Sequence, residues 1–170
     1  MKKIALLLTA FIGLSALQSC TIEEYYDDNG GGYSQVFEQP NETLIQEDAY
    51  TYSATWNFPG SLYDMDNVLV YRWQGNSWTL IPVSYNLGGS DMVKYDYDFT
   101  RYDVKVYFSA NFPVSELSNA EYNEFVYRQT FRIVVVPGGF AQKMNFSDYN
   151  ATISALGLEN APVKTLQIKK

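Results

Sequence analysis

The chain has 170 residues, of which 12 are basic and 19 acidic, giving a formal net charge of −7 at neutral pH. It contains no histidine and a single cysteine. The lack of histidine excludes Ser-His-Asp and Cys-His catalytic systems and histidine-ligated zinc sites. The acidic balance argues against nucleic acid or an anionic lipid surface as a partner, because both attract clustered Lys and Arg.

The first residues of the chain have the pattern of an export signal. Lys2 and Lys3 precede an uncharged, apolar run from Ile4 to Leu17. As a helix, these fourteen residues would span about 21 Å, which is short of the ~30 Å hydrocarbon core of a membrane. We therefore expect the apolar region of a secretory signal and not a transmembrane helix.

The only cysteine directly follows this run. The segment Leu17-Gln18-Ser19-Cys20 resembles a bacterial lipobox, in which the thiol receives a diacylglycerol and a peptidase cuts before the cysteine. The resemblance implies a lipoprotein signal peptide over residues 1–19 and a mature chain anchored by lipid on Cys20. Each buried acyl methylene would contribute about 0.8 kcal/mol to the anchoring. The alternative is an ordinary secretory signal with an unrelated cysteine.

The residues after the cysteine indicate a tether. Cleavage would leave ten basic residues against nineteen acidic ones, a net charge of −9. The first acidic residues of the mature chain are Glu23, Glu24, Asp27 and Asp28. They resemble the acidic export tracts of lipoproteins on the surface of Bacteroidota cells, and a solvated tether is the alternative. Asn29–Gly32 is typical of a flexible linker, so we expect residues 20–32 to form a lipidated acidic and glycine-rich tether.

Residues 33–170 are expected to form a single folded domain. Aromatic residues make up 16% of the chain, with 15 tyrosines, a composition that favours strands. Seven or eight short strands between turn residues predict an all-β fold, an antiparallel β-sandwich that is immunoglobulin-like or similar. The strands and the connection predicted outside the hairpins are Gln35–Glu38 (stopped by Pro40-Asn41), Ala49–Phe58, a polar Pro113–Glu124 connection with one helical turn, Phe125–Val136 and Val163–Ile168.

One short C-terminal helix is predicted near the end of the chain. Ser147 would cap it, and Gly157 would end it. Its apolar positions have helical spacing and are Tyr149, Ile153 and Leu156.

The first predicted hairpin turns at Gly75-Asn76. A glycine in the first central position suits a type II′ turn. This turn places Trp73 opposite Trp78, and the full set of pairs adds Tyr71 with Leu80 and Val68 with Val83. The run from Val68 to Tyr71 is apolar on both faces, which predicts an inner strand, whereas Pro82 must lie at an edge or a bulge.

The second predicted hairpin turns at Thr100-Arg101. Its expected pairs are Phe99 with Tyr102, Tyr97 with Val104, Tyr95 with Val106 and Val93 with Phe108. These residues would form a dry face, and the opposite, wet face would carry Lys94, Asp96, Asp98, Asp103, Lys105 and Tyr107. In this register Asp96 lies opposite Lys105, and a slip by one residue would exchange the two faces.

Several of these segments together resemble an uncharacterised family of Bacteroidota lipoproteins. The similar segments are the lipobox, the glycine tract, Gln35–Glu38, Val68–Arg72, Tyr97–Thr100 and Phe131–Pro137. The resemblance implies a β-rich domain on a lipidated tether. Members of the family often carry a collagen-like tract after the anchor, of which Asn29–Gly32 would be a remnant. The family implies no activity and no functional residue.

Three tryptophans are the candidates for stacking on a ligand. Trp73 and Trp78 flank the first hairpin turn, and Trp56 lies within a predicted strand. Such rings can stack on sugars while their polar edge stays in water. Large aromatic residues are also typical of a sandwich core, and we expect most of them to lie there.

The acidic residues suggest two further kinds of site. Asp64, Asp66 and Asn67, or Asp98 with Asp103, could contribute to a calcium site, but calcium takes six to eight oxygen ligands. Asp96, Asp98 and Asp103 could form a hydrolase pair, but a general acid needs a cleft that raises its pKa. We expect solvated carboxylates in both cases, and no catalytic residue, metal or cofactor.

The sequence therefore predicts a lipid-anchored outer-membrane protein, periplasmic or, as we favour, surface-exposed. Its expected role is that of a non-catalytic binding or interaction module. The alternative role is glycan binding through exposed Trp and Tyr, and a third is a carboxylate hydrolase. The expected partners are the membrane, through Cys20, and a glycan or a protein, whose contact could also be made at a sheet edge.

Overall fold

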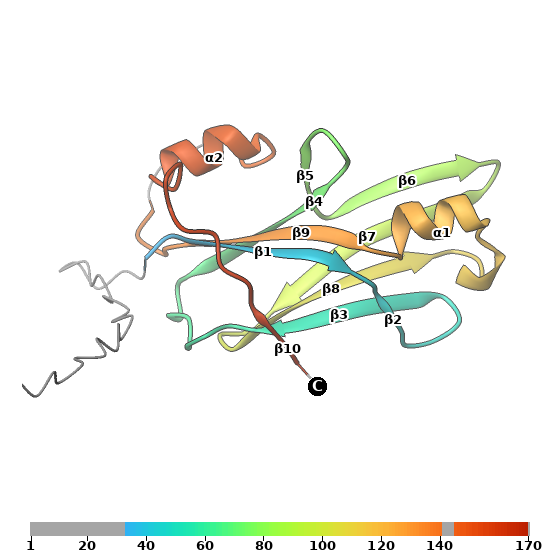
Figure 1. The fold of residues 1–170 in the computed structure, drawn as a ribbon, viewed down its shortest axis with the longest axis horizontal. Helices are drawn as coiled ribbons and strands as arrows, with labels where there is room; N and C mark the ends of the chain where they lie inside the picture. Colours follow the sequence, from blue (N-terminus) through green and yellow to red (C-terminus); the bar gives the residue numbers. More distant parts are fainter. Residues whose placement is uncertain (1–32, 141–144, 170) are drawn as a thin grey trace, which may run out of the picture.

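The computed structural model describes residues 33–140 and 145–169. They form two antiparallel sheets packed face to face, which confirms the predicted all-β sandwich (Figure 1). The predicted signal peptide over residues 1–19, the tether over residues 20–32 and the lipidation site Cys20 lie outside the described residues.

Strands that follow one another in the sequence are divided between the two sheets. One sheet has the order β1-β9-β4-β5, with strands spanning Gln35–Glu42, Gln129–Val136, Asn67–Trp73 and Trp78–Leu80. The other has the order β10-β3-β8-β7-β6, with strands spanning Gln167–Ile168, Thr51–Asn57, Asp103–Ala110, Asp91–Phe99 and Val83–Gly88. The short strand β2 (Ile45–Gln46) also pairs with β3. The helical segments are η1 (Val114–Glu116), α1 (Asn119–Phe125) and α2 (Tyr149–Ala155).

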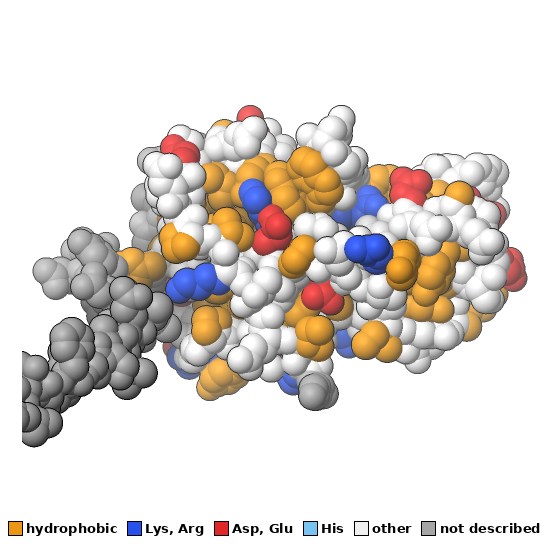
Figure 2. Space-filling view, viewed as in Figure 1, with side chains coloured by type: hydrophobic (Ala, Val, Ile, Leu, Met, Phe, Trp, Pro, Cys, Tyr) orange, Lys and Arg blue, Asp and Glu red, His pale blue; other side chains and the backbone are white. Residues whose placement is uncertain are grey.

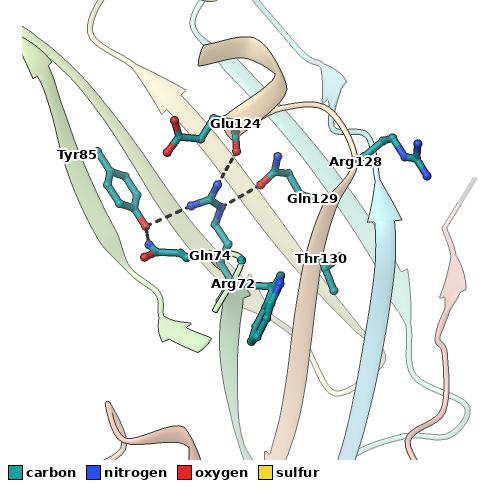
Figure 3. Close-up of a pocket in the computed structure, with 9 residues that line it drawn as sticks. Arg72, Gln74, Tyr85, Glu124, Arg128, Gln129 and Thr130 are labelled. Carbon is teal, nitrogen blue, oxygen red and sulfur yellow. Dashed lines mark hydrogen bonds between the residues drawn. The ribbon is translucent and has the colours of Figure 1, made fainter. Parts of the chain in front are cut away.

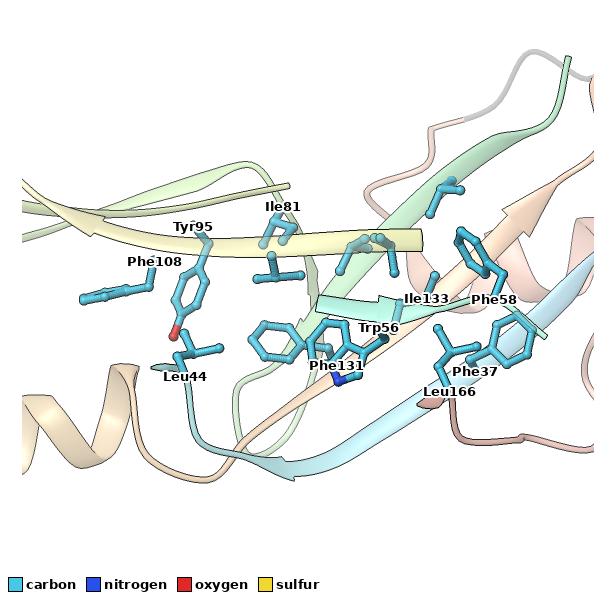
Figure 4. Close-up of a cluster of buried hydrophobic side chains, with 14 of the residues drawn as sticks. Phe37, Leu44, Trp56, Phe58, Ile81, Tyr95, Phe108, Phe131, Ile133 and Leu166 are labelled. Carbon is cyan, nitrogen blue, oxygen red and sulfur yellow. The ribbon is translucent and has the colours of Figure 1, made fainter. Parts of the chain in front are cut away.

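The main core lies between the sheets and is built from large apolar side chains (Figure 4). A second apolar cluster lies on the outer face of the four-stranded sheet, where α2 covers it (Figure 1). Strand β4 contributes to both, because Val68 and Val70 belong to the main core whereas Leu69 and Tyr71 belong to the outer cluster. This two-sided burial confirms the inner strand that the continuous apolar run predicts.

The hairpin of β4 and β5 has the predicted register beside its turn. Trp73 pairs with Trp78 and Tyr71 with Leu80, and Gly75 has a φ of +86°. The predicted pairing of Val68 with Val83 is wrong, since Val68 pairs with Val135 of β9 and Val83 with Tyr95 of β7. The chain changes sheets at Pro82, which has no N–H to continue a ladder.

The hairpin of β7 and β8 is shifted by two residues from the predicted register. Phe99 pairs with Val104 and Tyr95 with Phe108. The turn is longer than expected because the Thr100 N–H donates to the Asp103 carbonyl over 2.9 Å and the Thr100 hydroxyl donates to the Asp103 carboxylate over 2.6 Å.

A shift of two residues leaves each side chain on the face that was predicted for it. The dry face is confirmed at Val93, Tyr95, Val104, Val106 and Phe108, which are buried. Three details of the prediction are wrong, the first being Phe99, which is 36% exposed and not buried on the dry face. Lys105 lies opposite Asp98 and not Asp96, and Tyr102 belongs to the turn, where it is 61% exposed.

Other boundaries also differ from the predicted ones, and β3 at Thr51–Asn57 is shorter than the predicted Ala49–Phe58. Strand β1 continues past Pro40 through an irregularity between Gln39 and Glu42, where Asn41 has a φ of +59°. Of the predicted last strand, only Gln167–Ile168 forms β10. The cap of α2 is Asp148 and not Ser147, since its carboxylate accepts the Ala151 N–H over 3.0 Å.

Helix α1 lies in the Pro113–Glu124 connection, where a helical turn was predicted, and extends by one residue, Phe125, into the predicted strand over 125–136. Ser118 and Glu121 form a reciprocal capping box, in which the Ser118 N–H donates to the Glu121 carboxylate over 2.8 Å. This cap begins a helix that continues to Phe125, so that β9 begins only at Gln129. Gly157, with a φ of +68°, follows α2 as predicted.

The C-terminal segment joins the two sheets along one edge (Figure 1). The Glu38 N–H donates to the Lys164 carbonyl over 2.9 Å, and the Gln39 side chain donates to the Leu166 carbonyl over 3.0 Å. Beyond these contacts with β1, the segment becomes β10 and pairs with β3. The segment therefore closes the sandwich between β1 and β3.

Gly138 is predicted to accept no side chain without a loss of stability, because it lies against the backbone of Met65. A Cβ added at Gly138 would be 2.2 Å from the Met65 Cβ and 2.5 Å from its carbonyl oxygen. We expect Gly138→Ala to lower the free energy of unfolding by about 1–3 kcal/mol, the usual cost of overpacking. The matched control is Gly139→Ala, where nothing lies within 4 Å of the added Cβ. Equal urea midpoints for the two variants would contradict this prediction.

Candidate functional site

A row of four aromatic rings crosses the outer face of the four-stranded sheet. Trp73 and Trp78 come from β4 and β5, with centroids 5.0 Å apart. Tyr149 of α2 follows 5.6 Å from Trp78, and Tyr71 of β4 lies 5.1 Å from Tyr149 in an edge-to-face contact. Each such pair contributes about 0.5–1.5 kcal/mol beyond its burial. We call these four residues the aromatic row.

Arg132 and Glu38 provide the polar groups beside the row. They are cross-strand partners on β9 and β1, and the Arg132 Nε donates to a Glu38 carboxylate oxygen over 2.7 Å. The Arg132 guanidinium lies 4.5 Å from the Trp78 ring centroid and also donates to the Tyr149 hydroxyl. Figure 2 shows hydrophobic side chains gathered below α2 and β5, with basic and acidic groups among them.

Tyr71 fixes the buried end of the row. Its side chain is fully buried, and its hydroxyl donates to the Phe146 carbonyl over 2.7 Å and lies 3.2 Å from the Thr152 Oγ1. Burial raises the pKa of the Tyr71 hydroxyl to about 12, an effect that the Thr152 hydrogen bond partly opposes. The row is therefore held from below by a neutral tyrosine.

The three predicted stacking tryptophans have different positions. Trp73 is 37% exposed at the end of the row, and Trp78 is partly buried between Trp73 and Tyr149. Trp56 is completely buried in the main core, where its ring lies 5.8 Å from that of Phe131. Only Trp73 and Trp78 can therefore contribute to a surface for ligands.

A pocket of about 340 Å³ opens beside Trp73 (Figure 3). The ladder between β4 and β9 ends at the pair Arg72–Phe131, and beyond it the turn of the β4–β5 hairpin separates from the start of β9. The pocket occupies this gap and extends toward β6 and the end of α1. Its lining residues are Arg72, Trp73, Gln74, Gly75, Tyr85, Glu124, Arg128, Gln129 and Thr130.

Arg72 is the buried cation of this pocket, which we call the Arg72 pocket. Its side chain is on the inward face of β4 and the residue is only 4% exposed. The Nε donates to the Gln129 side chain over 2.9 Å, Nη1 to the Tyr85 hydroxyl over 3.4 Å, and Nη2 to the backbone carbonyl of Glu124. The guanidinium lies 4.9 Å from the Tyr95 ring centroid and 5.4 Å from that of Phe125.

Arg72 is not among the site residues that the sequence predicts. A signal was nevertheless present, because the alternation of an inner strand places Val68, Val70 and Arg72 on the same face. A lone arginine in line with two core valines must be buried or must bend the strand, and it is buried here. Of the other lining residues, Trp73, Gln74 and Gly75 directly follow Arg72, whereas the rest come from distant segments that nothing in the sequence joins.

Acidic residues considered for calcium or catalysis form ion pairs or hydrogen bonds with other side chains. Asp64 pairs with Arg101 over 3.1 Å, and Asp98 accepts the Tyr107 hydroxyl over 2.9 Å. The Lys169 ammonium, followed by the Thr100 hydroxyl, lowers the pKa of Asp103. Across residues 33–140 and 145–169, no three acidic, His or Cys side chains are grouped so as to hold a metal ion.

No family model matches the chain, and comparisons with curated proteins and with solved structures likewise found no match. None of the helices in the described part of the chain combines the length and the apolar character needed to cross a membrane. The site must therefore be interpreted from its own geometry.

Tyr71 is predicted to make the stability of the domain sensitive to alkaline pH. An unfolded tyrosine titrates near pH 10, so the raised pKa of about 12 stabilises the folded state below about pH 10 and this contribution is lost as the pH rises toward 12. Tyr71→Phe should flatten this decline. It should also lower stability at pH 7 by about 1 kcal/mol, because the Phe146 carbonyl loses its donor.

The measurement is urea unfolding between pH 8 and pH 12. Tyr102→Phe, at an exposed position, is the control and should decline in parallel with the wild type. An alkaline slope of Tyr71→Phe equal to that of the wild type would contradict the assignment.

Proposed function

We propose that the domain is a non-catalytic binding module that holds a glycan on the aromatic row. The observation that carries this proposal is the state of Trp73, which is 37% exposed and yet packed against Trp78 in a tilted contact with centroids 5.0 Å apart. An exposed indole usually loses rotamer freedom when a ligand binds, but this one is already fixed by its neighbour. Its free face offers an apolar surface to the C–H groups of a sugar ring, with a polar edge in water.

The polar groups beside the row suit the hydroxyl groups of a sugar. Arg132 is held by Glu38 and lies over Trp78, so its direction is fixed before any ligand arrives. Glu38 supplies acceptors and Arg132 supplies donors within the same patch. A flat apolar ring bordered by fixed donors and acceptors is the composition expected of a small-ligand surface.

We further propose that lipid on Cys20 anchors this module in the outer membrane. The support is the sequence pattern, a basic start, an apolar run of fourteen residues and a lipobox-like segment. The folded part begins soon after the proposed tether, since β1 starts at Gln35. Such an arrangement would hold the aromatic row near the membrane, where surface or periplasmic glycans are in reach, and we favour the surface.

Trp73→Ala tests the glycan proposal. The full-length protein in non-ionic detergent would be applied to a glycan array and the retained glycans titrated by calorimetry. We expect the variant to bind about tenfold more weakly, which corresponds to the loss of one good aromatic stacking contact. Tyr102→Ala removes another exposed aromatic ring, 61% exposed but outside the row, and should bind as the wild type does. The glycan proposal fails if no glycan is retained or if both variants lose the same affinity.

Cys20→Ala tests the anchor. In a Bacteroidota host, the wild type should have the intact mass of an acylated chain that begins at Cys20 and should sediment with membranes. The variant should lack the acyl mass and appear in the soluble fraction. Trimming of the wild type by external protease would place the domain at the cell surface. Two unmodified, soluble proteins would show that the lipobox interpretation is wrong.

A further inference from the structure

We propose that the Arg72 pocket binds the carboxylate of an acidic sugar residue, so that the glycan on the aromatic row is a carboxylated one. This inference rests on the proposed function and specifies its ligand. It concerns residues outside the row, apart from Trp73, which belongs to the row and also lines the pocket. A glycan stacked on Trp73 can therefore place its next residue in the pocket.

The charge of Arg72 is the first argument. The residue is 4% exposed, and no described carboxylate forms an ion pair with its guanidinium. Burial of a cation without a counter-charge is costly, and neutral acceptors together with aromatic faces offset only a part of that cost. The pocket therefore lacks one negative charge, which a bound carboxylate would supply.

The donors of Arg72 are the second argument. A guanidinium has five N–H groups in a planar fork. The acceptors on Gln129, Tyr85 and Glu124 take three of them, and the Tyr95 hydroxyl is a further side-chain hydrogen-bond partner, which leaves one N–H group for a ligand. Carboxylates are the acceptors that match this fork best, and charge-assisted hydrogen bonds are about twice as strong as neutral ones.

The size and lining of the pocket suit a sugar. The volume of 340 Å³ lies at the small end of the range for ligand sites, about 300–1,000 Å³. The side chains of Gln74, Tyr85 and Thr130 line it and offer partners for hydroxyl groups. The Tyr85 hydroxyl is already positioned, because it accepts from both Gln74 and Arg72.

Glu124 is the one acidic side chain among the lining residues, and its position permits a sharp test. Its backbone carbonyl accepts from Arg72, while its carboxylate forms no ion pair with the guanidinium (Figure 3). Because this carboxylate lines the pocket without an ion pair to Arg72, it repels an incoming anion. Its removal should therefore strengthen the binding of an acidic ligand and leave a neutral one unaffected.

The experiment compares acidic sugars with their neutral methyl esters. Oligosaccharides of galacturonate, glucuronate and N-acetylneuraminate, and the methyl ester of each, would be titrated into the full-length protein in non-ionic detergent at pH 7. We expect at least one acid to bind about ten- to a hundredfold more tightly than its ester, the range for hydrogen bonds to a charged group.

The variants assign this preference to the pocket. Arg72→Gln should bring the affinity for the acid down to that for its ester. Arg101→Gln makes the same change of charge at an exposed arginine that pairs with Asp64, and it should keep the preference. Glu124→Gln should bind the acid several-fold more tightly and the ester unchanged, which also provides a test if Arg72→Gln fails to fold.

The outcomes separate this inference from the proposed function. Equal binding of acids and esters that still depends on Trp73 would overturn the carboxylate subsite and leave glycan binding intact. An acid preference that survives Arg72→Gln, or that Glu124→Gln does not change, would also overturn the subsite. Retention of no glycan, on the array or in solution, would overturn both.

Discussion

The burial of β4 on both of its faces is the constraint on which the rest of the structure depends. Alternation along this strand sends Val68, Val70 and Arg72 into the sandwich and turns Leu69, Tyr71 and Trp73 to the outer face. A slip by one residue would exchange the two sets and put an arginine under α2 and a tyrosine hydroxyl in the core. The same pairing therefore fixes the main core, the outer cluster, the aromatic row and the Arg72 pocket. The candidate site and the stability of the fold have a common origin.

The outer face of the four-stranded sheet explains why the aromatic row ends in an exposed ring. An antiparallel sheet needs cover on only one side, but the outer face of this one is apolar and requires a second layer. Helix α2, which has only seven residues and is capped by Asp148, supplies that layer together with flanking residues such as Phe146 and Leu158. So short a helix covers Tyr71 through Tyr149 and does not extend over Trp73. The indole of Trp73 is therefore left uncovered by the helix and is accessible to a ligand.

The register of the strands was predictable where a turn residue or the alternation of apolar and polar residues specified it. The φ of +86° at Gly75 is one that glycine adopts at little cost, and the hairpin beside it has the predicted pairs. At the other hairpin the faces were predicted correctly and the pairs were not. The alternating pattern determines only the parity of the register, while the length of the turn depends on hydrogen bonds between Thr100 and Asp103. Side-chain hydrogen bonds of this kind compete with the shortest turn, and the sequence alone does not rank them.

The candidate site was predictable only in its exposed part. Trp73 and Trp78 flank a recognisable turn, whereas the ring that continues the row, Tyr149, comes from a helix about seventy residues further along the chain. Arg72 was within reach of the alternation argument, but its acceptors come from β6, β9 and the backbone of α1. Every residue has a backbone carbonyl, so the sequence does not indicate which carbonyl accepts from Arg72. The neutral surroundings of this cation could therefore not be predicted.

The neutral surroundings of Arg72 have a consequence for how an acidic protein can select an anion. The net charge of −7 opposes the approach of anions at long range, but salt screens this repulsion beyond roughly 8 Å at physiological ionic strength. A guanidinium held among aromatic rings and amide groups acts at short range and in a low dielectric, where its attraction is far stronger than in water. Arginine also keeps its charge on burial, whereas lysine readily loses a proton there. The unfavourable overall charge then suppresses non-specific binding of anions, and only a carboxylate that reaches the pocket gains the local attraction.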